Sequence, residues 1–308
     1  MTRIFRGLTL LCACSSLAAA QQVPDNQFAP HVSPPAYASG SGPRVVIDGA
    51  HHNFHTVDGR YSPFANLARR DGYRVAGNAS ALTDRTLADI DILVLANSLN
   101  VRNINNNWNL PTPSAFTPDE VAAVKRFVER GGALLMIADH MPFGGAIQET
   151  AIAFGIEWVN GFAYDENQNS IFRFNRTNGL VSHPIFNGRN AAERIDSIVA
   201  FTGSAFTIPA GGAPLFNIPA HSRVLMPDTA WQFSPATKSI SGDGLFQGAT
   251  LVVGKGRIVA AGEAAMFSAQ RSGPQGQGRM GFNEPSAPQN AQFALNVLHW
   301  LSGLLPAQ

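Results

Sequence analysis

Short apolar runs alternate with amphipathic segments along the first half of the chain. The runs at 44–48, 73–76, 91–96 and 133–138 are too short for helices and are typical of buried parallel strands. Residues 62–70 and 117–130 instead repeat apolar residues at helical spacing, and 82–88 predict a brief helical turn. This alternation predicts an α/β fold whose strands form a parallel sheet with right-handed crossovers.

Capping signals mark the helices predicted at 62–70 and 117–130. Ser62 and Pro63 predict a start with serine as the N-cap and proline at the first helical position. The sequence Thr-Pro-Asp-Glu at 117–120 is a capping box, in which Glu120 reaches back to the backbone of Thr117. Gly131 and Gly132 predict the end of that second helix.

The second half of the chain shows a less regular pattern. It predicts strands at 157–162, 195–201 and 213–218, a polar loop at 165–179, and a glycine-turn hairpin of 250–253 with 257–261. A closing helix is predicted at 286–302. The loop between them, residues 268–285, is long for a compact domain and is typical of a lid or binding loop.

The first twenty residues predict an export signal. Arg3 and Arg6 precede a short apolar run, and Ala18 to Ala20 form a cleavage site, so residues 1–20 are read as a signal peptide. The alternative is a lipoprotein acylated at Cys14; a transmembrane segment is disfavoured because the run is too short. Residues 21–43 are then a flexible lead-in, and 44–305 a single domain in the periplasm or outside the cell.

Charge and cysteine content exclude several classes of function. Lys and Arg number 22 and Asp and Glu 21, so no basic surface is expected to recruit nucleic acid or anionic lipid. Both cysteines, Cys12 and Cys14, lie in the signal segment. A chain cleaved after Ala20 therefore has neither a cysteine nucleophile nor a thiolate metal site.

Polar residues follow the predicted strands at the point where each strand ends. In a parallel sheet these ends meet at one edge, which is where ligands bind in open α/β folds. Three histidines lie just beyond the first strand, and another follows the fourth. The strand ends are Asp48, Asn97, Asp139 and Glu263, and the histidines are His51, His52, His55 and His140.

Two chemistries are compatible with these residues. In the first, His51, His52 and His55 with a carboxylate hold Zn²⁺ or another divalent cation. In the second, His140 or a loop histidine is a general base oriented by a strand-end aspartate, and backbone amides near Gly144 and Gly145 hold an anion.

Each of these residues also has a structural explanation. The apolar residues Ala146, Ile147, Ala151 and Phe154 predict a helix after the turn that follows Asp139. Asp139 is equally well read as the cap of this helix, with His140 hydrogen-bonding the loop. Trp108 either stacks on a sugar or other flat ligand, or packs its own loop against the domain. Ser268 and Thr56 are alternative nucleophiles, although neither has the context of a nucleophile elbow.

Five segments together resemble the class I glutamine-amidotransferase-like superfamily, and within it an exported bacterial branch that lacks the nucleophilic cysteine. The segments are RVVIDGAHHNFHT (44–56), DILVLANSL (91–99), FVERGGALLMIADH (127–140), HPIFNG (183–188) and GRIVAAGEAAMFS (256–268). The resemblance implies a three-layer, flavodoxin-like α/β fold with a mostly parallel sheet. Where true amidotransferases carry a Cys, the comparable turn here reads Ala138-Asp139-His140-Met141, so glutamine hydrolysis is not expected.

The sequence thus predicts an exported hydrolase acting on a small or carbohydrate-like ligand. Its expected catalytic residues are Asp48, His52, Asp139, His140 and Glu263, with Asn97, Trp108, Gly144 and Gly145 as binding residues. The alternative is a binding or interaction module of the same fold without catalysis.

Overall fold

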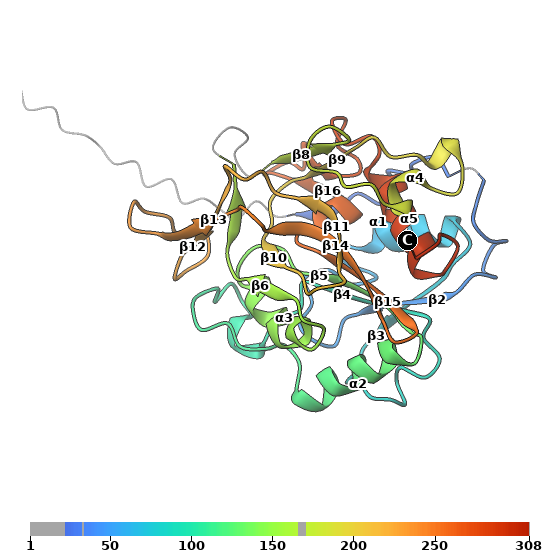
Figure 1. Cartoon of the computed structure of the whole chain (residues 1–308), viewed down its shortest axis with the longest axis horizontal. Coiled ribbons are helices and arrows are strands. Elements are labelled where there is room, and N and C mark those ends of the chain that lie inside the picture. Colours follow the sequence, from blue (N-terminus) through green and yellow to red (C-terminus); the bar gives the residue numbers. More distant parts are fainter. Residues whose placement is uncertain (1–21, 33, 166–170, 308) are drawn as a thin grey trace, which may run out of the picture.

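The computed structural model describes residues 22–32, 34–165 and 171–307 (Figure 1). The predicted signal segment lies outside this range. A nine-stranded sheet runs through the molecule in the order β3-β2-β4-β5-β15-β14-β10-β6, with β11 also paired to β14. Its strands are β2 (Arg44–Asp48), β3 (Arg74–Asn78), β4 (Ile92–Ala96), β5 (Ala133–Ile137), β6 (Glu157–Val159), β10 (Ala205–Thr207), β11 (Ala213–Asn217), β14 (Phe246–Val253) and β15 (Gly256–Ala261).

The first half of this sheet is parallel, as predicted. β2 pairs with β3 on one side and β4 on the other, and β5 then joins β4 to β15. β4 and β5 are buried at every position, as their continuous apolar runs require. From β2 the chain first adds β3 on one side and then β4 on the other side. The gap between β2 and β4 is therefore a topological switch point.

The expectation of a mostly parallel sheet is only half correct. Among the described residues, four pairings of the large sheet are parallel and four are antiparallel. β14 and β15 are joined by a short glycine turn at 254–255, and such a turn connects only antiparallel strands. The hairpin therefore switches the sheet from parallel to antiparallel.

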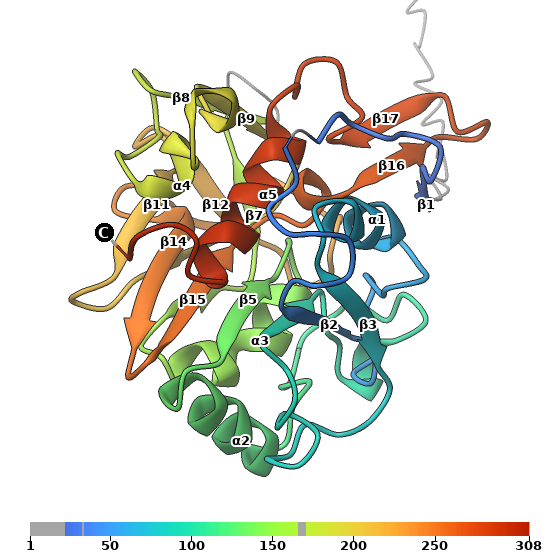
Figure 2. The ribbon, with the colours of Figure 1, turned by 90° about the vertical axis from the view of Figure 1, so that its right-hand side faces the viewer.

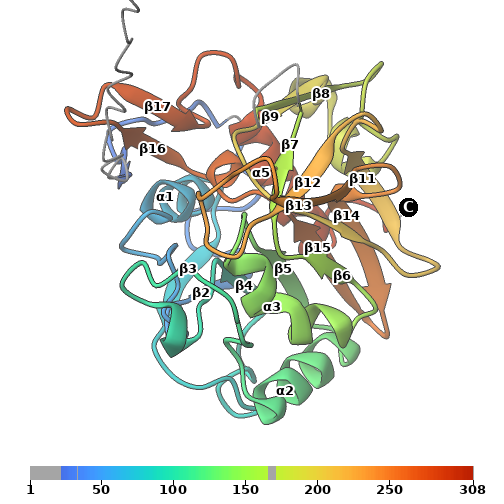
Figure 3. The same cartoon turned by 90° about the vertical axis from the view of Figure 1, so that its left-hand side faces the viewer.

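Helices cover both faces of the sheet (Figures 2 and 3), and an apolar core fills the space on each face. α1 (Ser62–Arg70) and α5 (Asn290–Leu301) pack on one face, and α2 (Pro118–Glu129) and α3 (Phe143–Ile152) on the other. Strand residues alternate between the cores: Ile92 and Val94 enter the first, Leu93 and Leu95 the second. This is the three-layer α/β architecture that the sequence predicts.

The predicted helix ends are partly confirmed. Thr117 and Glu120 form the capping box, with both reciprocal hydrogen bonds present. Ser62, predicted as an N-cap, is instead the first residue of α1 and donates its hydroxyl to the carbonyl of Gly59. The closing helix begins at Asn290, and residues 82–88 form turns without a helix.

The predicted loop at 268–285 contains a hairpin, β16 (Ala269–Ser272) with β17 (Gly278–Gly281). The residues described in the expected lead-in are also ordered against the domain, because β1 (Val23–Pro24) pairs with β16. Asp25 is buried there and accepts a hydrogen bond from Asn283. Local periodicity gives no sign of this pairing, since its partners are more than 200 residues apart.

The remaining strands are short and form smaller sheets beside the large one. β7 (Phe162–Tyr164), β12 (Arg223–Met226) and β13 (Lys238–Ser241) form one small sheet, so the strand predicted at 157–162 is in fact two strands in different sheets. β8 (Phe172–Asn175), in the predicted polar loop, pairs with β9 (Ser197–Ala200). α4 (Pro184–Asn187) and the 3₁₀ turns η1 (Val101–Asn103), η2 (Ala191–Glu193) and η3 (Ala265–Phe267) complete the elements. No helix in the described part of the chain is long and apolar enough to cross a membrane.

Candidate functional site

The parallel register places the predicted polar strand ends at one edge of the sheet. Ala96 and Ala261 both lie level with Ile137 of β5, so Asn97, Asp139 and Glu263 follow three adjacent strands at similar heights. Asp48 ends β2 at the same edge. The positions predicted from the sequence are therefore correct, but the side chains divide into two groups with different surroundings.

The first group is a buried imidazole held between two carboxylates. Nδ1 of His51 lies 2.8 Å from Asp48, and Nε2 lies 2.9 Å from Glu120, the capping-box residue of α2. Asn78 at the end of β3 donates a further hydrogen bond to Asp48. Burial alone would lower the pKa of His51, but the hydrogen bonds and charges of Asp48 and then Glu120 raise it above its ordinary value.

This geometry corrects the predicted metal site. Both ring nitrogens of His51 face carboxylates, so neither offers a lone pair to a cation. His52 is exposed in a left-handed conformation (φ 47°), and its side chain makes no hydrogen bond within the described chain. His55 is buried elsewhere, against Tyr61. In residues 22–32, 34–165 and 171–307 no three His, Cys, Asp or Glu residues could hold a metal ion.

The Asp48–His51–Glu120 group makes a prediction about stability and pH. Replacing Glu120 by Gln is expected to lower the free energy of unfolding by about 2 kcal/mol, the usual contribution of a charge-assisted hydrogen bond. Hydrogen bonds from the Thr117 backbone and His51 outweigh burial and hold the pKa of Glu120 near 2, so its contribution fades as pH falls from 4.5 towards 2. The His51 contribution is complete below pH 6.5 and is lost as pH rises through its raised pKa.

Urea denaturation of the wild type and Glu120→Gln across this pH range measures the difference directly. It should be largest between about pH 4.5 and 6.5 and smaller on both sides. Glu129→Gln, an exposed substitution at the end of the same helix, is the control and should show no such maximum. A difference independent of pH would show that His51 is not charged in the native protein.

The second group is built around His140. Its Nδ1 lies 2.6 Å from the carbonyl oxygen of Met141, so Nδ1 carries the proton and donates. The imidazole stacks on Phe162 with ring centroids 4.7 Å apart and an angle of 7°, and meets Trp231 edge-on at 4.6 Å. In the neutral ring Nε2 then carries the lone pair, which is the form a general base requires.

Asp139 is held beside His140 through its backbone. Asn97, at φ 49°, accepts a hydrogen bond from the Asp139 amide and so ties the end of β4 to the end of β5. One oxygen of Asp139 accepts from the His140 amide, and the side chain stays partly exposed. Asp139 does not cap the next helix, because α3 begins at Phe143 after Pro142 and has no side-chain cap.

Glu263 cannot serve as the predicted catalytic carboxylate in this arrangement. It is 1% exposed, and its two oxygens accept hydrogen bonds of 2.8 Å from the amides of Ala265 and Met266. It thereby fixes the turn η3. Burial, and then the charge of Asp139, raise the pKa of Glu263 well above its ordinary value. We interpret Glu263 as a structural residue beneath Asp139.

Arg60, which no sequence motif marks, belongs to the same group. Its guanidinium lies 4.3 Å above the Phe54 ring, and its Nε donates to the carbonyl of Gln22. Burial lowers the pKa of Arg60, and Asp139 acts in the opposite direction. Burial, then Arg60 and His140, lower the pKa of His55 well below its ordinary value, so His55 stays neutral. Arg60 lies between two predicted elements, where local patterns carry no signal for it.

Gly144 and Gly145 do not form the predicted anion site. The amide of Gly145 donates to Asn160 at 3.0 Å. A Cβ on Gly144 would lie 3.0 Å from Trp158, and one on Gly145 would overlap the hydroxyl of Thr112. These glycines let α3 pack closely against neighbouring segments of the same chain, and they leave no space for a ligand.

Gly145→Ala is therefore expected to destabilise the protein by about 1–3 kcal/mol, the cost of overpacking, even though alanine is the better helix former. Thermal or urea unfolding measures the change. Combining it with Thr112→Gly removes the overlapping side chain and should recover part of the loss. Unchanged stability in the single variant would restore the possibility of an open site at the start of α3.

Trp108 packs its loop, in agreement with the structural alternative. Its ring meets Phe54 at 5.3 Å and Phe143 at 5.6 Å, both edge-on. Its indole nitrogen is buried without a hydrogen-bond partner in the described chain. Trp231, which no sequence pattern singles out, is the exposed aromatic residue beside His140.

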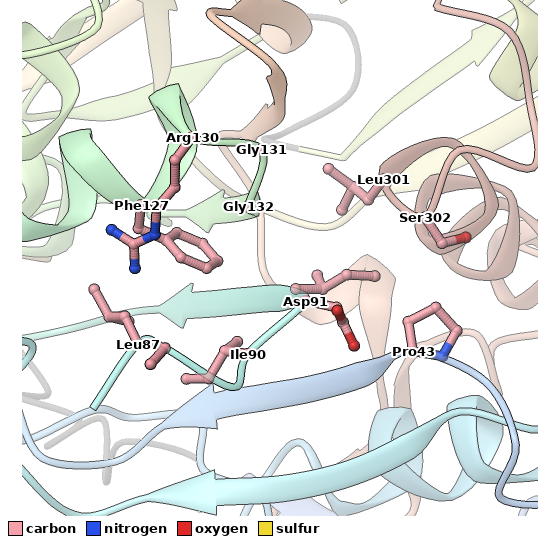
Figure 4. Close-up of a pocket in the computed structure, with 12 residues that line it drawn as sticks. Pro43, Leu87, Ile90, Asp91, Phe127, Arg130, Gly131, Gly132, Leu301 and Ser302 are labelled. Atoms are coloured by element: carbon pink, nitrogen blue, oxygen red, sulfur yellow. The ribbon is translucent and has the colours of Figure 1, made fainter. Parts of the chain in front are cut away.

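A pocket of about 430 Å³ lies at the opposite edge of the sheet, where the strands begin (Figure 4). Its charged groups already have partners. Asp91 accepts a hydrogen bond from the Arg44 amide, and Arg130 forms a 3.3 Å ion pair with Asp84. Neither charged side chain that lines this pocket is therefore left unpaired for a reaction. The candidate site remains at the carboxyl edge of the sheet, around His140 and Asp139.

Comparison with known proteins supports the fold. No protein-family model and no curated protein sequence matches this chain. The mmIFT52 N-terminal domain is similar in structure, with a TM-score of 0.57 and 14% identity over 84% of this chain and 97% of that domain.

Two further structures have lower scores. A ThuA-like protein from Bacteroides uniformis has a TM-score of 0.43 and 12% identity over 90% of this chain and 98% of its own. A GMP synthase protein from Thermoplasma acidophilum has a TM-score of 0.40 and 12% identity over 84% and 96%. At these identities the likeness concerns the fold alone, which is an α/β fold with a large, partly parallel sheet.

Proposed function

We propose that this protein is a hydrolase that acts on a small or carbohydrate-like substrate at the site of His140 and Asp139. The observation that carries the proposal is the orientation of His140. Its Nδ1 is fixed on the Met141 carbonyl, and its ring is held between Phe162 and Trp231. This arrangement selects one tautomer and one position for Nε2 before any substrate binds.

The proposed reaction uses His140 as a general base. Nε2 takes a proton from a water molecule as the water oxygen attacks the electrophilic centre of the substrate. The same proton is then delivered to the leaving group as the old bond breaks. The carboxylate of Asp139, which precedes His140 in the chain and is partly exposed, stabilises the imidazolium of His140 between these steps. Asn97 keeps Asp139 in place through its backbone amide.

Two other hydrolytic routes fit the geometry less well. A pair of catalytic carboxylates would need Glu263 as the partner of Asp139, but both Glu263 oxygens already accept backbone hydrogen bonds. An amidotransferase nucleophile would need a cysteine, and Cys12 and Cys14 both lie in the predicted signal segment. A third role, binding without catalysis, is supported by the exposed Trp231 beside the site.

A turnover assay separates catalysis from binding alone. The wild type is tested against a panel of nitrophenyl glycosides, esters and phosphate esters, together with Asp139→Asn. Turnover that falls in the variant, with circular dichroism unchanged, supports the hydrolase. A wild type inactive on the whole panel that still binds a sugar ligand would favour the binding module.

The cellular location forms part of the same proposal. The charged and apolar pattern of residues 1–20 supports export to the periplasm or the medium, and the five segments that resemble the superfamily support placement in the exported branch without the nucleophilic cysteine. Mass spectrometry of the protein from its native compartment tests the cleavage. A mature N-terminus at Gln21 is expected, whereas a lipid-modified Cys14 would support the anchored alternative.

A further inference from the structure

Trp231 has an unusual position on the surface. It is 53% exposed and adopts φ 68°, a backbone conformation that bulky residues rarely adopt. Phe233, two residues later, is 45% exposed and meets Phe162 edge-on at 5.1 Å. Both exposure of large rings and a left-handed tryptophan cost free energy, and local strain of this kind is concentrated at functional sites.

The loop that carries Trp231 is held in place by a second loop. The amide of Ala230 donates to the carbonyl of Trp108, and the amide of Leu110 donates to the carbonyl of Asp228. Asn109 and Thr229 form a bridge between these two bonds. Two segments more than 100 residues apart therefore fix the backbone next to Trp231. The exposed position of Trp231 is a consequence of this tertiary contact.

We propose that Trp231 and Phe233 form a stacking platform that binds the apolar face of a pyranose ring, with His140 at its inner edge. This inference rests on the proposed function and names the class of substrate. Trp231 contacts both His140 (4.6 Å) and Phe162 (4.7 Å), so a ring bound on it lies within reach of the catalytic imidazole.

The chemistry of the surroundings selects a sugar over a purely apolar ligand. A pyranose has an apolar C–H face that packs on an aromatic ring and hydroxyl groups around its rim. The partly exposed Asp139 carboxylate lies beside His140 to accept hydrogen bonds from such hydroxyls. The neighbours of the platform, Gln232 and Ser234, are exposed and polar, so the aromatic patch is much smaller than a stable protein interface.

Saturation-transfer NMR with methyl hexopyranosides tests the platform, using sorbitol as an acyclic control with similar hydroxyl groups. The gluco, galacto and manno methyl pyranosides serve as probes. Binding of at least one pyranoside, with no sorbitol binding, is expected. Trp231→Ala should weaken that binding by about tenfold or more, which corresponds to about 1.4 kcal/mol and to the upper range of an aromatic contact. Trp231→Phe should retain most of it.

Phe28→Ala is the matched control, because Phe28 is an exposed aromatic residue that packs on Phe282 in another part of the molecule. It should leave sugar binding unchanged. Equal binding by Trp231→Ala and wild type, or equal binding of sorbitol, would overturn the platform.

The platform and the hydrolase can fail separately. Turnover of a substrate without a sugar, dependent on His140, with no pyranoside binding would overturn the platform and leave the hydrolase. Pyranoside binding that depends on Trp231, without any turnover, would support the platform and overturn the hydrolase.

Discussion

His140→Ala is expected to lower the turnover of any substrate that the wild type hydrolyses by about 10²–10⁴-fold, the usual contribution of a positioned general base. The substitution removes Nε2, whose position is fixed by the hydrogen bond of Nδ1 to Met141 and whose lone pair is available for a proton. Steady-state kinetics on the best substrate of the panel measures the effect. Because the proton is transferred in the chemical step, we expect the loss mainly in kcat.

The control must separate loss of the base from loss of packing, since His140 also stacks on Phe162. His140→Phe retains an aromatic ring on Phe162 but has no nitrogen, and should be as inactive as alanine with a smaller change in Tm. His31→Ala changes an exposed histidine in the N-terminal segment and should leave kcat unchanged. Wild-type turnover in His140→Phe would contradict the general-base role and return His140 to a packing role.

The parallel half of the fold could be predicted because its signals are local. Four apolar runs, a capping box at Thr117 and the glycines that follow α2 each act over a few residues, and the structure confirms the strands, the cap and the helix end. The run predicted at 73–76 differs, because β3 (Arg74–Asn78) lies at the sheet edge and is partly exposed. In the antiparallel half, the hairpin of β14 and β15 and the strand β11 could also be predicted. The pairing around them could not, because β6, β7 and β10 have three residues each. Such strands carry too little periodicity, and their pairing is decided by distant segments.

The candidate site shows the same division. Strand ends can be read from a sequence, so Asp48, Asn97, Asp139 and Glu263 are predictable at one edge. Their partners are not, since those partners come from distant elements. Glu120, 69 residues from His51, can be recognised in the sequence only as part of a helix cap. Its carboxylate nevertheless hydrogen-bonds the His51 imidazole, which was predicted to bind a metal ion.

Asp71→Ala is expected to have the largest effect on stability, a loss of about 3–5 kcal/mol in the free energy of unfolding. Asp71 is fully buried at the end of α1. One of its oxygens accepts from Nε2 of His299 in α5 at 2.7 Å, and the other from the amide of Ala36 at 2.8 Å. Removing the carboxylate leaves the fully buried Nε2 of His299 without an acceptor, and the partly buried amide of Ala36 loses its acceptor as well. The contacts that join α5, α1 and the N-terminal segment at this point are then lost. Urea denaturation at neutral pH measures the loss, which is large against a typical total of about 5–15 kcal/mol.

Two further variants determine whether burial is the cause. Asp196→Ala removes an exposed aspartate that pairs with Arg176 and Arg194, and should cost far less than Asp71→Ala because exposed ion pairs contribute little to stability. Adding His299→Leu to Asp71→Ala removes the stranded donor as well as the acceptor, so the double variant should be more stable than the sum of the two single losses predicts. Additive losses would mean that the two side chains are not coupled. A cost for Asp71→Ala no greater than that for Asp196→Ala would show that this buried contact contributes little to holding α5 on the sheet.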